Sequence, residues 1–374
     1  MITKYRIHAL DNLHEIVLDG VPFQNLSQCP VCGSNNLTDI AVLKDSLSSA
    51  WCRQCTHAFL RKKPTDAWYI RWYTSAWDTV GGKPVAPPAA KNPVQHAKAV
   101  LKKLLRYGLS NRSIFDYCSR SLVPRAAVLD VGCGYGGYLL PFRRAGCLVH
   151  GIELSPHREE AARRLGIKTS GIGVEQLEPG TFGCKFDLVF SNHVLEHVQD
   201  LHAFFCAVRK VLKPGGWLYL AVPNFETYFL LQDFFFALHV HSFNARSLAT
   251  LVLANGFEIH RSGQDHELRI LARMSNGGTA PSPMSDLPSG IDIRPEWIHR
   301  RLFGPDFEKG VGKSVFAKAK TLRYPVISPY EYGFDTTLDS SSPKVIELLA
   351  PSGCKLPVEF ESLDYPGRAP FWVK

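Results

Sequence analysis

Four cysteines in two pairs are the residues whose chemistry is most directly indicated by their spacing. Cys29 and Cys32 enclose Pro-Val, Cys52 and Cys55 enclose Arg-Gln, and 19 residues separate the pairs. A two-residue gap lets one tight turn aim two thiolates at the same ion, and two such pairs supply the four ligands of a tetrahedral Zn²⁺ site. The spacing therefore predicts a structural zinc ribbon, with one of its strands over Leu37–Leu43.

A glycine-rich segment, Val128–Gly137, has the pattern of a strand that turns into a helix. Gly132, Gly134 and Gly136 let the backbone pass close to a ligand whose polar end meets the helix N-terminus. Glu153 lies 21 residues after Gly132, at the end of the next predicted strand, where a carboxylate can accept both ribose hydroxyls. These features predict an adenosine cofactor, and the glycines alone leave NAD(P) open.

Asp130 favours one cofactor over the other. It stands two residues before the first glycine, a position we expect at the mouth of the crevice. A carboxylate there attracts an ammonium or a sulfonium and opposes a pyrophosphate. S-adenosylmethionine carries both cations, so Asp130 indicates this cofactor.

Four motifs stand in order along the chain. They are Val128–Gly137, Gly151-Ile-Glu153, Phe186–His197 and Leu212-Lys-Pro-Gly-Gly216. Together they resemble class I S-adenosylmethionine-dependent methyltransferases over residues 126–273, most of all the branch containing ubiquinone-type O-methyltransferases. The resemblance implies a seven-stranded, Rossmann-like α/β sheet. It also implies Gly132, Gly134 and Gly136 at the methionine and ribose, Glu153 on the ribose, Val174 and Glu175 beside the adenine, and Asn192 facing the methionine end.

A second resemblance involves the zinc ribbon. Phe243 and Arg246-Ser-Leu248 match zinc-containing C-methyltransferases that modify keto-deoxysugars on nucleotide carriers, and His239 falls at the position of that family's base. Leu238 stands where that family has Glu. The resemblance implies His239 as a general base.

Methyl transfer to an oxygen or an activated carbon needs a group that removes a proton. Histidine suits this task near neutral pH. His239 and His241 follow an aromatic run, Phe225–Phe236, that predicts a wall for the acceptor, and His193 follows the predicted fourth strand. Each of the three is a candidate base, with a packing role open as the alternative.

Alternating apolar runs and helical stretches must position these residues. The predicted strands cover 128–131, 148–152, 187–190, 217–222 and 267–272, and the predicted helices include one capped by Ser155 with Pro156 at its first position and one over 245–254. Repeated strand–helix–strand units predict a parallel sheet covered on both faces.

The length of 374 residues exceeds what a single core usually serves and predicts several domains. We expect a zinc ribbon region over 1–64, a helical lid or linker over 65–125, the Rossmann-like domain over 126–274, a linker over 275–290 and a C-terminal extension over 291–374. The second region contains a Gly/Pro/Ala-rich loop over 81–93, an amphipathic helix over 95–107, and two tyrosines, Tyr69 and Tyr73, that could fold over the cofactor.

Charge is unevenly placed. Residues 1–125 hold 17 Lys and Arg against 8 Asp and Glu, whereas residues 126–374 hold 26 of each. The asymmetry suggests an acidic partner for the N-terminal part, either a phosphorylated small molecule or RNA, and a solvated lysine-rich helix is an alternative at least as well supported. No secretory signal or membrane span is expected, and the ten cysteines then indicate a reducing, cytoplasmic location.

Three functions follow from these patterns. The favoured one is a methyltransferase acting on a sugar-like, nucleotide-linked or other small metabolite. The second is an RNA methyltransferase that uses the ribbon and the basic N-terminal third, although Ser191–Val194 lacks the Pro-Pro-aromatic run typical of base-amine methylation. The third is a module that binds S-adenosylmethionine without catalysis.

Overall fold

The computed structural model describes residues 2–10, 21–43, 47–76, 112–225, 238–264, 267–275 and 343–351. The predicted loop 81–93, the helix 95–107, most of the aromatic run and most of the C-terminal extension lie outside the described residues. In the described part of the chain, no helix is long and apolar enough to cross a membrane.

The larger unit is a seven-stranded sheet in the order β12-β13-β10-β9-β6-β7-β8. The strands from β10 to β8 run parallel, and β13 and β12 are added antiparallel at one end. Their bounds are Ala127–Val131 (β6), Leu148–Ile152 (β7), Lys168–Ser170 (β8), Phe186–Asn192 (β9), Leu212–Pro223 (β10), Phe257–Gln264 (β12) and Glu267–Met274 (β13). The predicted Rossmann-like sheet is confirmed.

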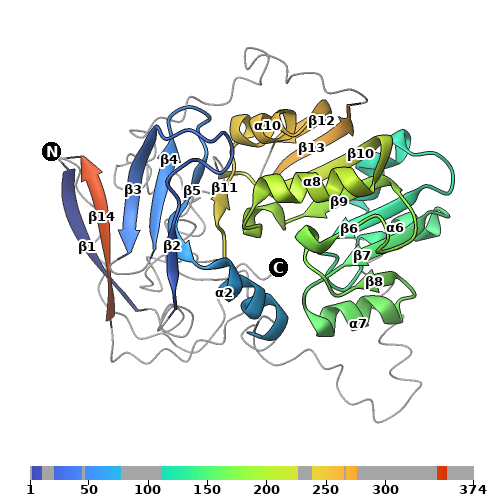
Figure 1. The fold of residues 1–374 in the computed structure, drawn as a ribbon, viewed down its shortest axis with the longest axis horizontal. Helices are drawn as coiled ribbons and strands as arrows, with labels where there is room; N and C mark the ends of the chain where they lie inside the picture. The colour runs from blue at the N-terminus through green and yellow to red at the C-terminus, as the bar shows by residue number, and fades with distance from the viewer. Residues whose placement is uncertain are drawn as a thin grey trace, which may run out of the picture.

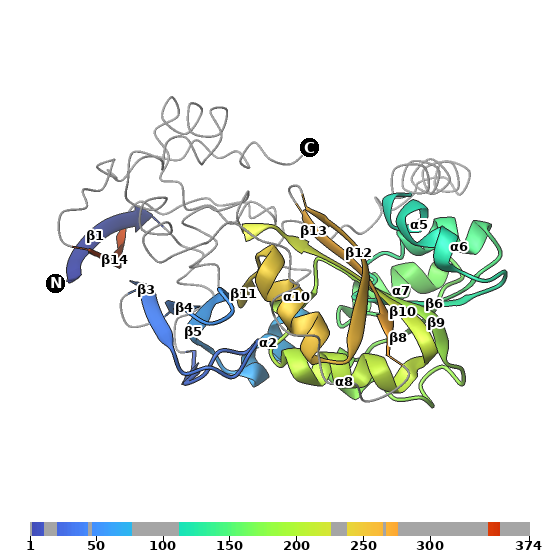
Figure 2. The ribbon, with the colours of Figure 1, turned by 90° about the horizontal axis from the view of Figure 1, so that it is seen from above.

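Helices cover both faces of this sheet, as Figure 2 shows for α8 and α10 on one side and α5 and α6 on the other. The helices are α5 (Ser113–Cys118), α6 (Leu139–Arg144), α7 (Pro156–Arg164), α8 (Leu201–Val211) and α10 (Ala245–Ala254). Ile114 of α5 shares a buried core with Phe142 and Ala162. The packed domain therefore begins ahead of residue 126.

Side-chain caps fix where these helices start. The Ser155 hydroxyl accepts from the Arg158 amide at 3.2 Å, with Pro156 following as expected from the sequence. Asp200 caps α8 and Asn244 caps α10 in the same way, at 2.9 and 2.8 Å. Each cap satisfies a backbone donor that has no partner within the helix.

The second sheet contains the cysteine pairs and lies beside the first (Figure 1). Its strands follow the order β1-β14-β3-β4-β5-β11, with β2 also paired to β5. Their bounds are Ile2–Leu10 (β1), Phe23–Asn25 (β2), Leu37–Leu43 (β3), Ser48–Cys52 (β4), Ala58–Pro64 (β5), His241–Ser242 (β11) and Pro343–Pro351 (β14). This sheet extends beyond the predicted region 1–64, because distant strands pair with the backbone groups of β5 and β3.

One buried core joins the two sheets. Trp51 and Phe59 of the ribbon belong to the same apolar cluster as Phe205 of α8 and Val252 of α10. After β5 the chain continues into helix α2 (Asp66–Arg71) and a π-helical turn, Trp72–Ala76. This segment bridges the ribbon and the larger sheet.

Candidate functional site

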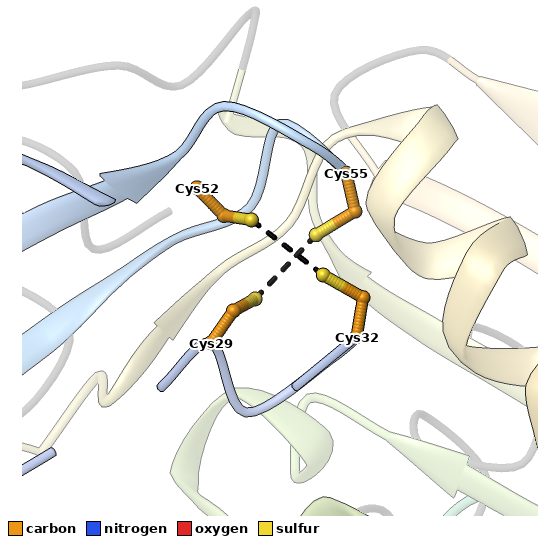
Figure 3. A group of neighbouring side chains, drawn as sticks. All are labelled: Cys29, Cys32, Cys52 and Cys55. Carbon is orange, nitrogen blue, oxygen red and sulfur yellow. Dashed lines mark hydrogen bonds between the residues drawn. The ribbon is translucent and has the colours of Figure 1, made fainter. Parts of the chain in front are cut away.

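The four cysteines of the two pairs converge as the sequence predicts (Figure 3). The sulfur atoms of Cys29 and Cys55 lie 3.5 Å apart, as do those of Cys32 and Cys52, and all four lie within 4.8 Å of one another. Zn–S bonds of about 2.3 Å place tetrahedral sulfurs roughly 3.8 Å apart, so the donor set fits Zn²⁺ in number, type and spacing. Hydrogen bonds lower the pKa of Cys32 to about 7, and the side-chain hydrogen bond with Cys29 contributes most to this shift.

The turns after each pair show how the cluster meets the larger domain. Gly33 has a φ of +70° and Thr56 a φ of +64°, a conformation that costs little for glycine and more for threonine. Asn244 holds Thr56 in place, because its side-chain amide donates to the Thr56 carbonyl at 2.6 Å. The second turn is thereby docked on the N-terminus of α10.

His241, one of the three predicted bases, lies at this docking surface. Its Nε2 is 2.9 Å from the Val198 carbonyl, and its Nδ1 is 3.1 Å from Nε2 of His57. Since a carbonyl only accepts, Nε2 of His241 donates and Nδ1 accepts from His57. Burial, and then the neighbouring His57, lower the pKa of His241 well below its usual value. Both nitrogens are engaged, and His241 does not line the cavity described next.

A cavity lies at the carboxyl ends of β6 and β7, where ligands bind in open parallel sheets. Its walls come from segments far apart in the chain: 69–73, 131–134, 152–158, 172–175 and 193–199. The predicted residues that line it are Gly132, Gly134, Glu153, Val174, Glu175 and His193. The side-chain position of Gly134 has no atom within 4 Å, so the loop leaves room for a ligand there.

Glu153 is held rigidly at the end of β7. Its Oε2 accepts from the Gly134 amide at 2.8 Å and its Oε1 accepts from the Ser155 amide at 2.9 Å. A carboxylate can accept about four hydrogen bonds. The glycine loop thus orients the carboxylate that the sequence assigns to a ribose.

Three predicted cofactor residues do not line the cavity. Gly136 packs against Ala162 of α7 and against Ile167, which a side chain at this position would overlap. Asn192 is hydrogen-bonded to Tyr138. Asp130 lies in the central strand and is 2 % exposed. Burial, and then the nearby Glu153, raise the pKa of Asp130 well above its usual value. Asp130 therefore lies behind the loop, and its neutral form is favoured in the absence of a cation.

His193 lines the cavity, and its backbone has a φ of +53°. Its Nε2 is 2.8 Å from Glu267 and its Nδ1 is 3.4 Å from Glu196. Burial alone would lower its pKa, but the bonds to the two carboxylates outweigh burial and raise the pKa of His193 to about 10. In this state the ring is a proton donor, so its predicted role as base stays a prediction.

His197 is a cavity residue to which the sequence analysis assigned no role. Its Nδ1 is 2.8 Å from the Leu238 carbonyl, which only accepts hydrogen bonds, so Nδ1 donates. The ring of His239 contacts the ring of His197, with the centroids 4.8 Å apart. Glu196 lies 3.8 Å from Nε2 of His197. The signal in the sequence is the spacing of His193, Glu196 and His197 along one turn after β9.

The segment that follows the ribbon forms another wall. Tyr69, Ile70 and Tyr73 line the cavity from α2 and the following turn. Lys63, at the end of β5, is 1 % exposed, donates to Asp66 at 2.9 Å and hydrogen-bonds Gln199, which also lines the cavity. Burial lowers the pKa of Lys63, although Asp66 opposes this shift. Lys63 thus ties the ribbon to the wall of the cavity.

Comparison with known proteins agrees with this geometry. Residues 102–262 match the family model described as methyltransferase domain. A ubiquinone biosynthesis O-methyltransferase from Xanthomonas oryzae is 35% identical over 161 residues, which cover 41% of this chain and 56% of that protein. The protein of the same description from Bartonella bacilliformis is 32% identical over 117 residues, 29% of this chain and 47% of its own length. The chain thus spans about half the length of the curated relatives it matches.

Solved structures with a similar arrangement are methyltransferases too. Magnesium protoporphyrin IX methyltransferase from Synechocystis is 19% identical, with coverage of 56% of this chain and 100% of that chain and a TM-score of 0.40. The 1,6-didemethyltoxoflavin-N1-methyltransferase of Burkholderia thailandensis is 20% identical, with 49% and 91% coverage and a TM-score of 0.36. Scores this low carry no argument about the acceptor.

Proposed function

We propose that this chain, whose residues 102–262 match the family model described as methyltransferase domain, transfers the methyl group of S-adenosylmethionine to an oxygen or an activated carbon of a small molecule. The observation that carries the proposal is that Gly134 and the Glu153 carboxylate that it orients line the same cavity as His193 and His197. A nucleoside end and a proton-handling end within one cavity are what this reaction requires.

The cofactor would lie along the glycine loop. Glu153 would accept the ribose hydroxyls, Val174 and Glu175 would flank the adenine, and Asp130 would stabilise positive charge from behind the loop. S-adenosylmethionine supplies the electrophilic methyl group when bound.

The acceptor would approach from the side of His193, Glu196, His197 and His239, which we call the histidine–carboxylate cluster. An acceptor electron pair forms the bond to the methyl carbon, the carbon–sulfur bond breaks, and a hydroxyl acceptor loses its proton. We assign proton removal to this cluster. The named O-methyltransferase relatives support an oxygen acceptor, and a sugar-like or nucleotide-linked metabolite is the class we favour.

Calorimetry with S-adenosylhomocysteine tests the cofactor assignment. We expect binding to the full chain and weakening by at least about tenfold in Glu153→Gln, because hydrogen bonds to a charged group contribute about 1.5–3 kcal/mol. Glu178→Gln is the matched control, since that carboxylate is exposed and paired with Lys210. Tight binding of NADH with no heat from S-adenosylhomocysteine would contradict the proposal.

A further inference from the structure

Two arginines on neighbouring strands lie around one tyrosine of α5. The guanidinium carbon of Arg261, in β12, lies 4.0 Å from the centroid of the Tyr117 ring, and its Nη1 donates to the Tyr117 carbonyl at 3.5 Å. Arg269 belongs to β13. Burial raises the pKa of Tyr117, and the charges of Arg261 and Arg269 oppose this shift. Both guanidiniums therefore lie close to the same phenol.

A β-bulge turns Arg261 towards the face of the sheet that α5 covers. Ile259 lies opposite Ala272 of β13, and after a register shift Arg261 lies opposite Leu271, which belongs to the core beneath α5. The extra residue, His260, reverses the alternation of side chains. A regular ladder would place Arg261 on the other face. Bulges are frequent beside functional sites, where they re-aim a side chain.

Gly263 leaves open space between these groups. A side-chain carbon at Gly263 would lie 3.7 Å from Oη of Tyr117 and 3.7 Å from Nε of Arg269, so the hydroxyl and the guanidinium face one space. Neither the backbone nor the packing requires glycine here, because its φ is outside the left-handed region and these neighbours are at ordinary contact distance. Glycine inside a strand often marks the close approach of a ligand.

Two of the polar groups around this space lack a complementary partner. Oη of Tyr117 is buried and has no hydrogen-bond partner among the described residues. Arg261 is exposed and forms no ion pair with a carboxylate in the described part of the chain. A buried hydroxyl without a hydrogen bond is costly, and a guanidinium is a rigid fork that fits phosphate oxygens. An anion in this space would satisfy both groups.

The space lies level with the carboxyl ends of the parallel strands. Arg269 is opposite Ala221 of β10, and Ala221 is opposite Asn192 of β9. Two residues before Arg269, the Glu267 carboxylate lies 2.8 Å from Nε2 of His193, which lines the cavity. Residues two apart on a strand are separated by about 6.6 Å. One small molecule can therefore reach both the cavity and the space beside Arg269.

We propose that Arg261, Arg269 and Tyr117 bind a phosphate group of the acceptor while the atom to be methylated lies in the cavity; this inference rests on the proposed function. Two guanidiniums match a phosphate monoester, whose charge is about −1.5 to −2 at pH 7, whereas a carboxylate needs only one. The acceptor is then a phosphorylated small molecule.

Calorimetry with inorganic phosphate tests this subsite in the full chain saturated with S-adenosylhomocysteine. We expect phosphate to bind, and its affinity to fall by at least about tenfold in Arg261→Gln and in Arg269→Gln, because each loses charge-assisted hydrogen bonds. Tyr117→Phe keeps the stacked ring and should lower affinity by about threefold, as for one neutral hydrogen bond. Gly263→Glu should abolish binding, because its carboxylate would occupy the space.

Arg273→Gln is the matched control. Arg273 is exposed on the same face of β13, four residues beyond Arg269, and donates to the Gly215 carbonyl at 3.1 Å, so this variant should bind phosphate like the wild type. Binding of S-adenosylhomocysteine, measured first in every variant, shows that the variant is folded and should be unchanged.

Three results would overturn the proposal. They are no binding of phosphate to the wild type, equal losses in Arg273→Gln and Arg261→Gln, and acetate binding as tightly as phosphate, which would indicate a carboxylate site. A uridine decamer that binds far more tightly than phosphate, with steep salt dependence and with a loss in Arg273→Gln, would replace the small acceptor by RNA. If phosphate binds as expected but S-adenosylhomocysteine does not, the subsite stands and the proposed function fails. The reverse result leaves the proposed function standing without the subsite.

Discussion

The four-cysteine site and the histidine–carboxylate cluster both gather ionisable side chains, but they are built in opposite ways. The cysteines come from two short turns within 27 residues, joined by strands of one hairpin-like unit. The cluster draws on the turn after β9 and on a segment held between two sheets. Local spacing therefore specifies the first site, while the second exists only when the whole core is assembled.

The four-cysteine site and the histidine–carboxylate cluster also differ in the role that their surroundings indicate. The four sulfurs point only at one another, with three of the cysteines buried, which is the closed arrangement of a structural site. The cluster borders a cavity through His193 and His197. We therefore expect loss of the first site to abolish folding and loss of the second to abolish turnover.

Cys52→Ser should have the largest effect. Apparent binding free energies of structural zinc are about 10–16 kcal/mol, which is as large as the net stability of most domains. Because ribbon and α8 share one core, both sheets should unfold together, in one transition seen by circular dichroism. Cys206→Ser, at an exposed position, should melt like the wild type. A Cys52→Ser chain in which the sheet β12-β13-β10-β9-β6-β7-β8 stays folded would show that the two regions are independent.

His197→Ala should lower turnover by about a hundredfold or more, the usual range for loss of a group that handles the proton. Binding of S-adenosylhomocysteine should change by less than about threefold. His193, His239 and His241 are to be substituted in parallel, with an acceptor that the wild type methylates. If His241→Asn lowers turnover only as far as it lowers the melting temperature, His241 has a structural role at the docking surface. Full activity of His197→Ala would contradict the role of the histidine–carboxylate cluster in proton removal.

Lys63→Met tests whether the ribbon positions the cavity wall. The apolar chain of similar length should fold, but Gln199 loses its partner, so we expect cofactor affinity to fall by about three- to tenfold, in line with the loss of one hydrogen bond. Asp66→Asn, at a partner 58% exposed, should change affinity by less than about threefold. Equal effects of the two substitutions would mean that the ion pair, not the contact to Gln199, matters.

The smallest effect concerns Asp130. Its pKa is raised in the empty protein, and a sulfonium nearby favours the charged form, so binding of S-adenosylmethionine should release a proton. Affinity for this cation should therefore rise with pH until Asp130 is ionised without ligand, while affinity for neutral S-adenosylhomocysteine stays flatter. Calorimetry in buffers of different ionisation enthalpy measures the proton. In Asp130→Asn, the affinities for S-adenosylmethionine and S-adenosylhomocysteine should depend on pH in the same way. If the pH dependence of this variant equals that of the wild type, another group takes up or releases the proton.

Much of the fold follows from local pattern. The strand over Leu37–Leu43, the strand over 148–152 and the helix over 245–254 have the predicted bounds, and Ser155 caps its helix as expected. These features depend on periodicity and on contacts within a few residues. The pairing of β11 and β14 with the ribbon does not, because strand pairing over 100 residues or more leaves no periodic signal in the sequence.

The residues of the candidate site also fall into those predictable from local spacing and those that depend on distant segments. Gly134 and Glu153 follow the two strands of one strand–helix–strand unit, so their meeting is predictable from spacing. His241 looks like a base in the sequence, yet the fold engages both of its nitrogens. His197 was assigned no role from the sequence, yet the fold places it in the wall of the cavity, with its Nε2 3.8 Å from Glu196. Whether a histidine can accept a proton depends on neighbours that are distant in the chain.

By itself, then, the sequence determined the four-thiolate site, the glycine loop with its carboxylate and the alternation that makes a parallel sheet, because each is encoded within one turn or one strand–helix unit. Tertiary structure alone decided that Asp130 lies behind the loop, that β5 is extended by β11, and which histidines border the cavity. Burial and the direction of a lone pair are set by packing between remote segments, and no short stretch of chain contains that information.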